Sequence, residues 1–357
     1  MKVSFLSERM LPGLGMDRLV HSYASFLAQD GHDVRLHTPE ASLDLVPSGL
    51  THTPLPPIRS RRAPIQDWEV WGALPALPTS KERHWVLATP PYTSLSGFLG
   101  DTTILHGGTS PPTGLGWKGT ATYLWRELSS SLVHLPLATR IVTLSKFLAK
   151  GLPASVHGAT AIIPPGWDHY PLKTREESAL MRERLLGGRQ HLLLVMGRLN
   201  AKYQPYKGLL DILRIVRSLP HVRLAASGWG DDRDGCALQH AGVAVLPQHP
   251  SEDMGNLIGA ADLVVMASRW EGYGLPAAEA QFQGVPVIAL NRGALSEVVH
   301  QGVSGMLVDD VQGLADGIRN LLDEPQRRKE MGLAGQERAQ SRTWAHAAAT
   351  FSSFLFS

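Results

Sequence analysis

A chain of 357 residues is longer than a single hydrophobic core usually supports, so two domains are expected. Its 34 Lys and Arg residues almost balance its 32 Asp and Glu residues, and this near-neutral charge gives little support for a nucleic-acid partner. The single cysteine, Cys236, excludes an intramolecular disulfide and a cysteine-rich metal site.

The sequence contains no obvious membrane-targeting segment. No apolar run approaches the roughly 18 residues that a membrane-spanning helix needs. The first apolar stretch is short and is interrupted by Glu8 and Arg9, which is not typical of a signal peptide. We therefore expect a cytoplasmic protein.

The N-terminal residues read as the opening of a doubly wound α/β fold. Strand-like residues 2–6 are followed by the turn Gly13-Leu14-Gly15, a helical pattern that ends at Gly31, and a second strand at 34–37. Glycines in such a turn let backbone N–H groups approach a phosphate, but they also close turns that bind nothing. From the sequence, Gly15 can belong either to a phosphate-binding turn or to a turn that binds no ligand.

Residues 41–83 are rich in proline and poor in periodicity, which predicts a long irregular segment. Arg59, Arg61 and Arg62 precede Trp68 and Trp71 within it. A basic cluster beside tryptophan makes residues 59–71 a candidate for peripheral contact with the inner face of a membrane, or for an anionic acceptor. A solvent-exposed loop is the favoured interpretation.

Alternating strand and helix patterns return after this segment. His106 directly follows the predicted strand 102–105 and precedes two glycines. Open α/β sheets bind their ligands at the carboxyl ends of strands, so His106 is a better candidate for a functional histidine than His84 or His134. A structural role remains the alternative.

A second α/β domain begins after a charged connector at residues 174–186. Arg198 lies at the end of the predicted strand 192–196, and Lys207 precedes a helix at 208–219. Two cations at a strand end and a helix start can hold a diphosphate, although two solvated surface charges would look the same. The next strand, 222–226, leads to Gly228 and Gly230, and Asp231 to Asp234 after them are interpreted as a polar turn rather than a metal site.

Two carboxylates follow the apolar strand 263–267. Glu271 stands among glycines that permit a tight turn, and Pro276 suits the first turn of a helix over 275–283. On that helix Glu279 lies at the edge of the buried stripe rather than opposite it. A carboxylate half-turned into a core needs hydrogen-bond donors, either from the protein or from a ligand rich in hydroxyl groups.

This second half resembles the retaining glycosyltransferases of family 4, which have the GT-B fold and a Glu-x7-Glu motif. The residues that carry the resemblance are Glu271-Gly272-Tyr273-Gly274-Leu275, Glu279-Ala280, Gly284-Val285-Pro286, Glu297-Val298-Val299, Gly197-Arg198-Leu199, Lys207-Gly208 and residues 302–308. In the first half, residues 15–18, 31–34, 145–146 and 163–168 are similar to segments of the same family. Residues 41–83 have no counterpart.

The resemblance implies two Rossmann-like doubly wound domains that face a central cleft. We expect residues 1–168 to form an acceptor domain, joined by a C-terminal helix at about 342–357, and residues 169–341 to form a nucleotide-sugar donor domain.

The resemblance also implies a role for each motif residue. Those roles are diphosphate binding by Gly15, Arg198 and Lys207, ribose binding by Glu279, sugar contacts by His106 and Glu271, sugar-binding amides at Gly272, Tyr273, Gly274 and Leu275, and a base region at Gly228, Gly230 and Gln248. Lys202 competes with Lys207, which is preferred because Gly208 and a helix follow it.

The expected activity is transfer of a sugar from a nucleotide-diphosphate sugar to an acceptor with retention of configuration. No metal is expected, because Arg198 and Lys207 would stabilise the leaving group. A GT-B nucleotide-sugar epimerase and a non-catalytic nucleotide-sugar-binding module are the alternatives.

Overall fold

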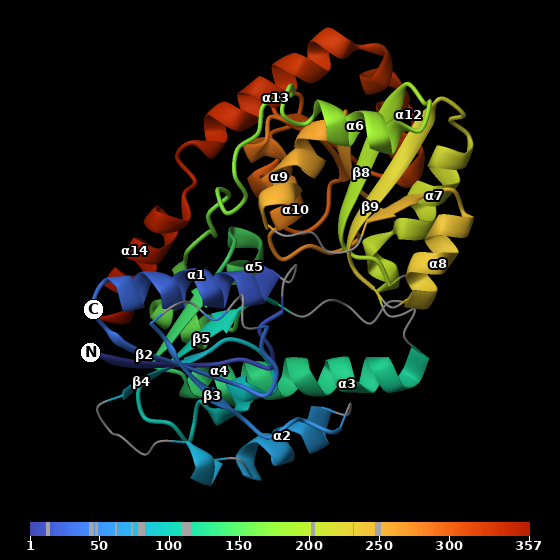
Figure 1. Ribbon diagram of the computed structural model, residues 1–357. Coiled ribbons are helices and arrows are strands. Elements are labelled where there is room, and N and C mark those ends of the chain that lie inside the picture. The colour runs from blue at the N-terminus through green and yellow to red at the C-terminus, as the bar shows by residue number, and fades with distance from the viewer. Residues whose placement is uncertain are drawn as a thin grey trace. The chain divides into compact units, whose positions relative to one another are not determined.

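The computed structural model describes residues 1–11, 15–42, 46, 49–60, 63–72, 74–77, 83–108, 116–200, 204–230, 232–246 and 251–357. The chain forms two compact units (Figure 1). Unit 1 comprises Met1–Pro165 together with Ala345–Ser357, and unit 2 comprises Gly166–Trp344. The chain therefore passes between the two units after residues 165 and 344.

Unit 1 is built on a parallel sheet, in which the described residues form seven strands in the order β3-β2-β1-β4-β5-β6-β7. The strands are β1 Lys2–Leu6, β2 Asp33–Thr38, β3 Thr51–Pro54, β4 Arg83–Leu87, β5 Thr102–His106, β6 Arg140–Thr143 and β7 Thr160–Ile162. The strand order reverses between β1 and β4. Such a reversal is the switch point at which a doubly wound sheet opens to a ligand.

Unit 1 also contains helices and short helical turns. They are α1 Gly15–Gln29, α2 Ala63–Gly72, α3 Gly116–Ser129, a π-helical turn at Ser130–His134, α4 Leu135–Leu137, α5 Lys146–Lys150 and α14 Trp344–Leu355, with short 3-10 turns at Leu74–Ala76, Tyr92–Leu95 and Ala154–Ala159. Phe351 of α14 stacks on Tyr23 of α1 with ring centroids 4.2 Å apart. The C-terminal helix thus completes the core of unit 1.

The prediction of an irregular, solvent-exposed loop over residues 41–83 is wrong for residues 51–54 and 63–72, whereas residues 55–60 have no regular structure. Residues 51–54 pair with β2 as the edge strand β3, and residues 63–72 form α2. Helix α2 buries Val70 and is joined to α3, since Trp125 Nε1 donates to Asp67 at 2.9 Å and Arg126 donates to Gln66 at 2.8 Å. These partners lie about sixty positions away, which explains why the local pattern was weak.

Unit 2 repeats the architecture with a second parallel sheet, whose described strands run in the order β10-β9-β8-β11-β12-β13. Its strands are β8 His191–Arg198, β9 Val222–Trp229, β10 Ala244–Leu246, β11 Leu263–Met266, β12 Val287–Leu290 and β13 Gly305–Val308. Its helices are α6 Ala179–Leu186, α7 Leu209–Arg217, α8 Asp232–His240, α9 Ser251–Ala260, α10 Leu275–Phe282, α11 Leu295–Val298, α12 Val311–Asp323 and α13 Pro325–Ala339. The switch point of this sheet lies between β8 and β11.

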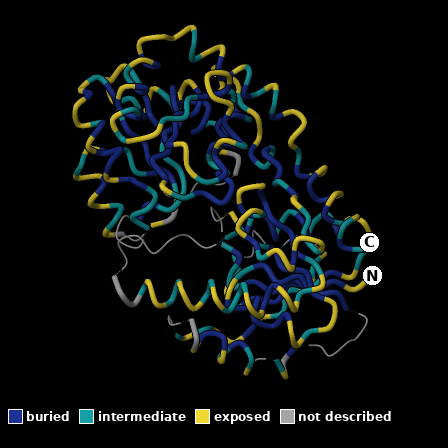
Figure 2. The backbone as a smooth tube through the Cα atoms, turned by 180° about the vertical axis from the view of Figure 1, so that it is seen from behind, coloured by how far each residue is buried: buried dark blue, intermediate teal, exposed yellow. Residues whose placement is uncertain are grey.

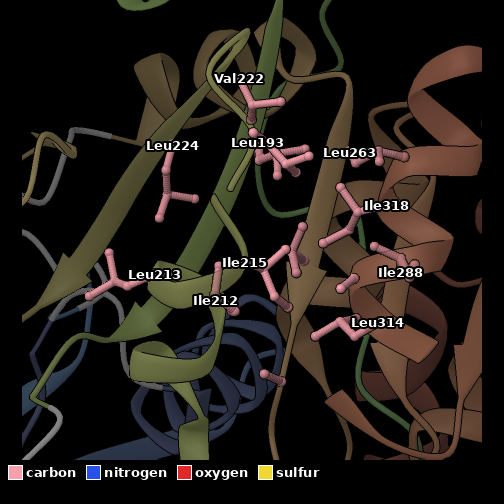
Figure 3. Packing of buried hydrophobic residues seen from close by; sticks show 14 of the residues in the cluster. Leu193, Ile212, Leu213, Ile215, Val222, Leu224, Leu263, Ile288, Leu314 and Ile318 are labelled. Carbon is pink, nitrogen blue, oxygen red and sulfur yellow. The ribbon is translucent and has the colours of Figure 1, made fainter. Parts of the chain in front are cut away.

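The core of unit 2 forms where α7 and α12 cover the sheet (Figure 3). Ile212 and Ile215 of α7 and Leu314 and Ile318 of α12 are spaced three or four residues apart, so each pair lies on one helix face. They pack against strand residues such as Leu193. Figure 2 shows that buried backbone lies inside each unit and exposed backbone lies on its outside.

Two glycines permit close backbone contacts at the switch point of unit 2. Gly208 has a φ of +68°, and a Cβ there would overlap the backbone of Ala267 at the end of β11. Gly228 lies opposite Gly197 across β9 and β8, where a Cβ would overlap the Gly197 carbonyl group. The loop before α7 can therefore lie directly on the end of β11 only because residue 208 is glycine.

We expect Gly208→Ala to destabilise unit 2 by about 3 kcal/mol, because overpacking adds to the strain of a left-handed backbone. Gly187→Ala is the matched control. Gly187 also has a positive φ, +54°, but its Cβ would meet open space, so only the backbone strain of about 1 kcal/mol applies. Urea-induced unfolding measures both, and equal losses in the two variants would contradict the packing argument.

A buried histidine makes the stability of unit 1 depend on pH. His37 of β2 is 1% exposed, and its Nε2 lies 3.2 Å from Ser4 Oγ. Burial, as the largest cause, and the positive charges of Arg83 and Arg35 together lower the pKa of His37 to about 4. The folded chain therefore resists a protonation that the unfolded chain accepts at a pKa near 6.5.

The resulting stabilisation is complete above pH 6.5 and is lost as the pH falls from about 6.5 to 4. We expect His37 alone to account for a loss of about 3 kcal/mol at pH 4. His37→Gln removes the titration and keeps an amide that can bond Ser4, so its unfolding midpoint in urea should fall less over this range. Identical pH profiles for the two proteins would show that His37 is not responsible.

Candidate functional site

Three of the site residues expected in the second half line one pocket at the switch point of unit 2. Arg198 ends β8, Lys207 precedes α7, and Glu271 follows β11. The pocket walls are completed by Val195, Met196, Leu209, Ile212, Val265, Met266, Ala267 and Ser268. The carboxyl edge of the sheet thus brings together two cations and one carboxylate from three separate segments.

Lys207 and Glu271 form an ion pair in this pocket, with 2.7 Å between Nζ and Oε1. The Glu271 side chain is 8% exposed and the Lys207 side chain 25%. The backbone of Glu271 is fixed by a hydrogen bond, because Ala294 N donates to its carbonyl oxygen at 2.9 Å. The loop that carries Lys207 is held by a bond from Arg269 N to Tyr206 O of 2.7 Å. Both charges are therefore fixed by the backbone around them.

The turn between the two glutamates leads directly into α10. Gly274 adopts a left-handed φ of +101° at the N-cap, and Pro276 occupies the first turn. Tyr273 is buried, with its hydroxyl accepting from Trp167 Nε1 at 2.8 Å. The backbone amides of Gly272, Tyr273, Gly274 and Leu275 thus lie at a helix N-terminus, where the helix dipole favours oxygen-rich or anionic groups.

Glu279 is 9% exposed on α10 and has a donor from the protein. His169 Nε2 lies 3.0 Å from its Oε1, and Trp344 Nε1 donates to His169 Nδ1 at 3.1 Å. The position of Glu279 at the edge of the buried stripe predicted a donor, but the sequence did not identify His169 or Trp344. Only the aromatic run after Gly166 hinted at them, since His169 is 110 positions from Glu279.

The base region is described in part. Gly228 is the penultimate residue of β9 and lies opposite Gly197 of β8, and Gly230 follows the strand and lies next to Leu199. Gln248 and the competing cation Lys202 lie outside the described residues.

In unit 1 the two expected residues lie at one edge of the sheet. Gly15 is the first residue of α1, and His106 is the last residue of β5. A Cβ on Gly107 would lie 2.8 Å from Met16 Sδ, so the end of β5 touches the first turn of α1. Desolvation lowers the pKa of His106 to about 4, which keeps the imidazole neutral near pH 7.

The described residues contain no cluster of three or more His, Cys, Asp or Glu side chains placed to hold a metal ion. Nor does any helix within them have the length and apolar character required to cross a membrane.

Sequence comparison matches residues 190–324 to the family model described as glycosyl transferases group 1. D-inositol 3-phosphate glycosyltransferase of Segniliparus rotundus is 33% identical over 199 residues, which is 51% of this chain and 43% of that protein. The enzyme of the same name from Mycolicibacterium smegmatis is 36% identical over 172 residues, covering 44% of this chain and 38% of that one. The matches therefore span less than half the length of these curated relatives.

Solved structures resemble the whole chain. Sucrose-phosphate synthase from Thermosynechococcus elongatus has a TM-score of 0.78 at 20% identity, over 99% of this chain and 97% of that one. Anabaena HepE in complex with UDP and glucose has a TM-score of 0.77 at 16% identity over all of both chains. WaaG, a glycosyltransferase involved in lipopolysaccharide biosynthesis, has a TM-score of 0.76 at 18% identity, over 99% of each.

These likenesses confirm the fold class expected from the sequence, two Rossmann-like units with parallel sheets. Residues 190–324 match the glycosyl transferases group 1 family model, in a chain with the GT-B fold.

Proposed function

We propose that this protein is a retaining glycosyltransferase that transfers a sugar from a nucleotide-diphosphate sugar without a metal ion. The observation that carries the proposal is the Lys207–Glu271 ion pair in a pocket that also contains Arg198. An ion pair of this kind provides a lysine ammonium group that can bind an anionic ligand. It also provides a carboxylate that can accept hydrogen bonds from hydroxyl groups.

In this proposal the diphosphate binds beside Arg198 and Lys207, at the N-terminus of α7. When Lys207 turns to the phosphate, Glu271 is left to accept hydrogen bonds from the transferred sugar. The two cations stabilise the charge that grows on the leaving diphosphate, which is the task a metal performs in other enzymes. Backbone amides of residues 272–275 would add donors to the sugar or the phosphate.

The acceptor hydroxyl would attack the anomeric carbon on the face from which the diphosphate departs. The bond from that carbon to the phosphate oxygen breaks as the new glycosidic bond forms, and the hydroxyl proton passes to the leaving phosphate. Configuration is thereby retained. Gly15 would offer its N–H to the diphosphate, and a neutral His106 would contact the sugar.

The similar proteins suggest which ligands to try first. One of the similar structures, that of HepE, contains UDP and glucose, and a second structure of HepE contains UDP-glucose. UDP-sugars are therefore the first donors to test. The curated relatives are named for D-inositol 3-phosphate, which makes a phosphorylated cyclitol the first acceptor to include.

Unit 1 also presents a surface suited to a lipid bilayer. Large apolar side chains are exposed on α2, on α3 and on the π-helical turn that follows it: Ile65, Trp68, Leu124, Leu128 and Leu132. The last three are four residues apart, and α2 contacts α3. We propose that this surface, rather than the arginines near residue 60 alone, makes peripheral contact with a membrane.

The first test of the proposed function is a panel of UDP-, GDP-, ADP- and dTDP-sugars with the purified protein. We expect one of them to be hydrolysed slowly or transferred, and the activity to persist in EDTA. Lys207→Met and Glu271→Gln should each lower the rate by at least about 100-fold, as the loss of one transition-state contact does. Lys329→Met, which removes an exposed lysine of α13, should leave the rate unchanged.

The panel also separates the alternatives. An epimerised sugar formed without any acceptor would indicate an epimerase, and tight binding without turnover would indicate a binding module. Absence of binding and turnover across the whole panel would refute the proposal. The anomeric configuration of the product, read by NMR, tests retention.

Flotation with anionic phospholipid vesicles tests the membrane surface. We expect the protein to float, and Trp68→Ser combined with Leu128→Ser to remove most of the bound fraction, because burial of each side chain contributes about 2 kcal/mol. Leu180→Ser is the control, since Leu180 is 79% exposed on α6 of unit 2. Equal flotation of both variants would locate the contact elsewhere.

A further inference from the structure

Segment 167–173 lies along α10 and is hydrogen-bonded to three side chains. One comes from the turn before the helix, one from the helix and one from the residue after it. Tyr273 accepts from Trp167 Nε1 at 2.8 Å, and Glu279 contacts His169 Nε2 at 3.0 Å. Beyond them, Gln283 donates to the carbonyl oxygen of residue 171 at 2.8 Å and accepts from the amide of residue 173 at 2.9 Å. The middle contact, from His169, is the one made to a carboxylate, that of Glu279.

The tautomer of His169 follows from its two partners. An indole N–H can only donate, so His169 Nδ1 must accept from Trp344 Nε1. The proton of the imidazole then lies on Nε2 and is donated to Glu279 Oε1. Trp344 is itself fixed, since its backbone N–H donates to Asp168 Oδ1 at 2.7 Å.

The chain of bonds from Trp344 through His169 orients the Glu279 carboxylate. His169 contacts Oε1, and no partner of Oε2 is recorded among the described residues. A carboxylate that is buried and held by one oxygen presents its other oxygen in a fixed direction. Two neighbouring hydroxyl groups, such as those of a ribose, are suitable donors for that oxygen.

We infer that His169 is a positioning residue for recognition of the ribose by Glu279, with Trp344 setting its tautomer. The inference rests on the proposed function, because it takes the nucleotide of the donor as the ligand. The alternative role, attachment of segment 167–173 to α10, is served already by Trp167 on one side and Gln283 on the other.

The experiment measures how much the ribose hydroxyls contribute to binding. Calorimetry gives the dissociation constants of UDP and 2′,3′-dideoxy-UDP, or of the matching pair for whichever base the donor panel selects. For the wild-type protein we expect the dideoxy compound to bind at least about tenfold more weakly, the loss expected for hydrogen bonds to a charged acceptor.

Two substitutions at His169 separate donation to Glu279 from mere packing. In His169→Phe the ring stays but the donor is lost, so the ratio of the two dissociation constants should fall to about threefold or less, well below the tenfold expected of the wild type. In His169→Gln the amide nitrogen lies near the Nε2 position, so most of the ratio should be kept. An unchanged ratio in His169→Phe, or an equal loss in both variants, would overturn the inference.

Gln283→Met is the matched control for the attachment of the segment. It removes both contacts to residues 171 and 173, so it should lower the melting temperature and leave the ratio unchanged. If His169→Phe does not fold, Trp344→Phe replaces it. That variant removes the indole donor and keeps an aromatic ring, and a ratio equal to the wild-type value would overturn the role of Trp344 in setting the tautomer.

These outcomes are distinct from failure of the proposed function. If no nucleoside diphosphate binds the wild-type protein, the proposed function fails and this inference fails with it. If the ribonucleotide binds and the ratio does not depend on His169, the inference alone is wrong.

Discussion

Burial of two carboxylates beside one sheet edge is the constraint on which the structure of unit 2 depends. Glu271 is 6% exposed and Glu279 is 9% exposed, and an ionised carboxylate in such a place requires a partner. The partners come from distant segments, since Lys207 is 64 positions from Glu271 and His169 is 110 positions from Glu279. Removal of one partner from a buried ion pair typically costs about 3–5 kcal/mol. The loop before α7 and the segment after residue 166 must therefore both pack against the β11–α10 connection.

Glycine residues make this packing possible, because they have no side chain to separate the two backbones. Gly208 allows the Lys207 loop to touch the end of β11, and Gly293 lies against the backbone of Glu271 in the same way. Both have a positive φ, which other residues rarely adopt. The charges of the site are thus positioned by close backbone contacts and do not depend on long flexible side chains alone.

The sequence predicted the parts of this arrangement that have a local cause. Strand patterns, glycine turns and the rule that ligands bind at carboxyl ends were enough to bring Arg198, Lys207 and Glu271 to one edge. The geometry of a single helix was enough to show that Glu279 needed a donor. The donor itself was not predictable, because His169 reaches α10 only through the tertiary packing of a segment without regular structure. Strand β3 and helix α2 were missed for the same reason, since their stabilising contacts lie in β2 and α3.

The His169 donor connects Glu279 to the places where the chain enters and leaves unit 2. His169 follows the first connection by a few residues, and Trp344 is the last residue before the second. Within unit 2 these two ends are bound to each other, because Trp167 N donates to Arg342 O at 2.7 Å and Trp344 N donates to Asp168. Gly166 also lies against the backbone of Trp344. Glu279 and the two connections are in this way joined by one hydrogen-bonded network.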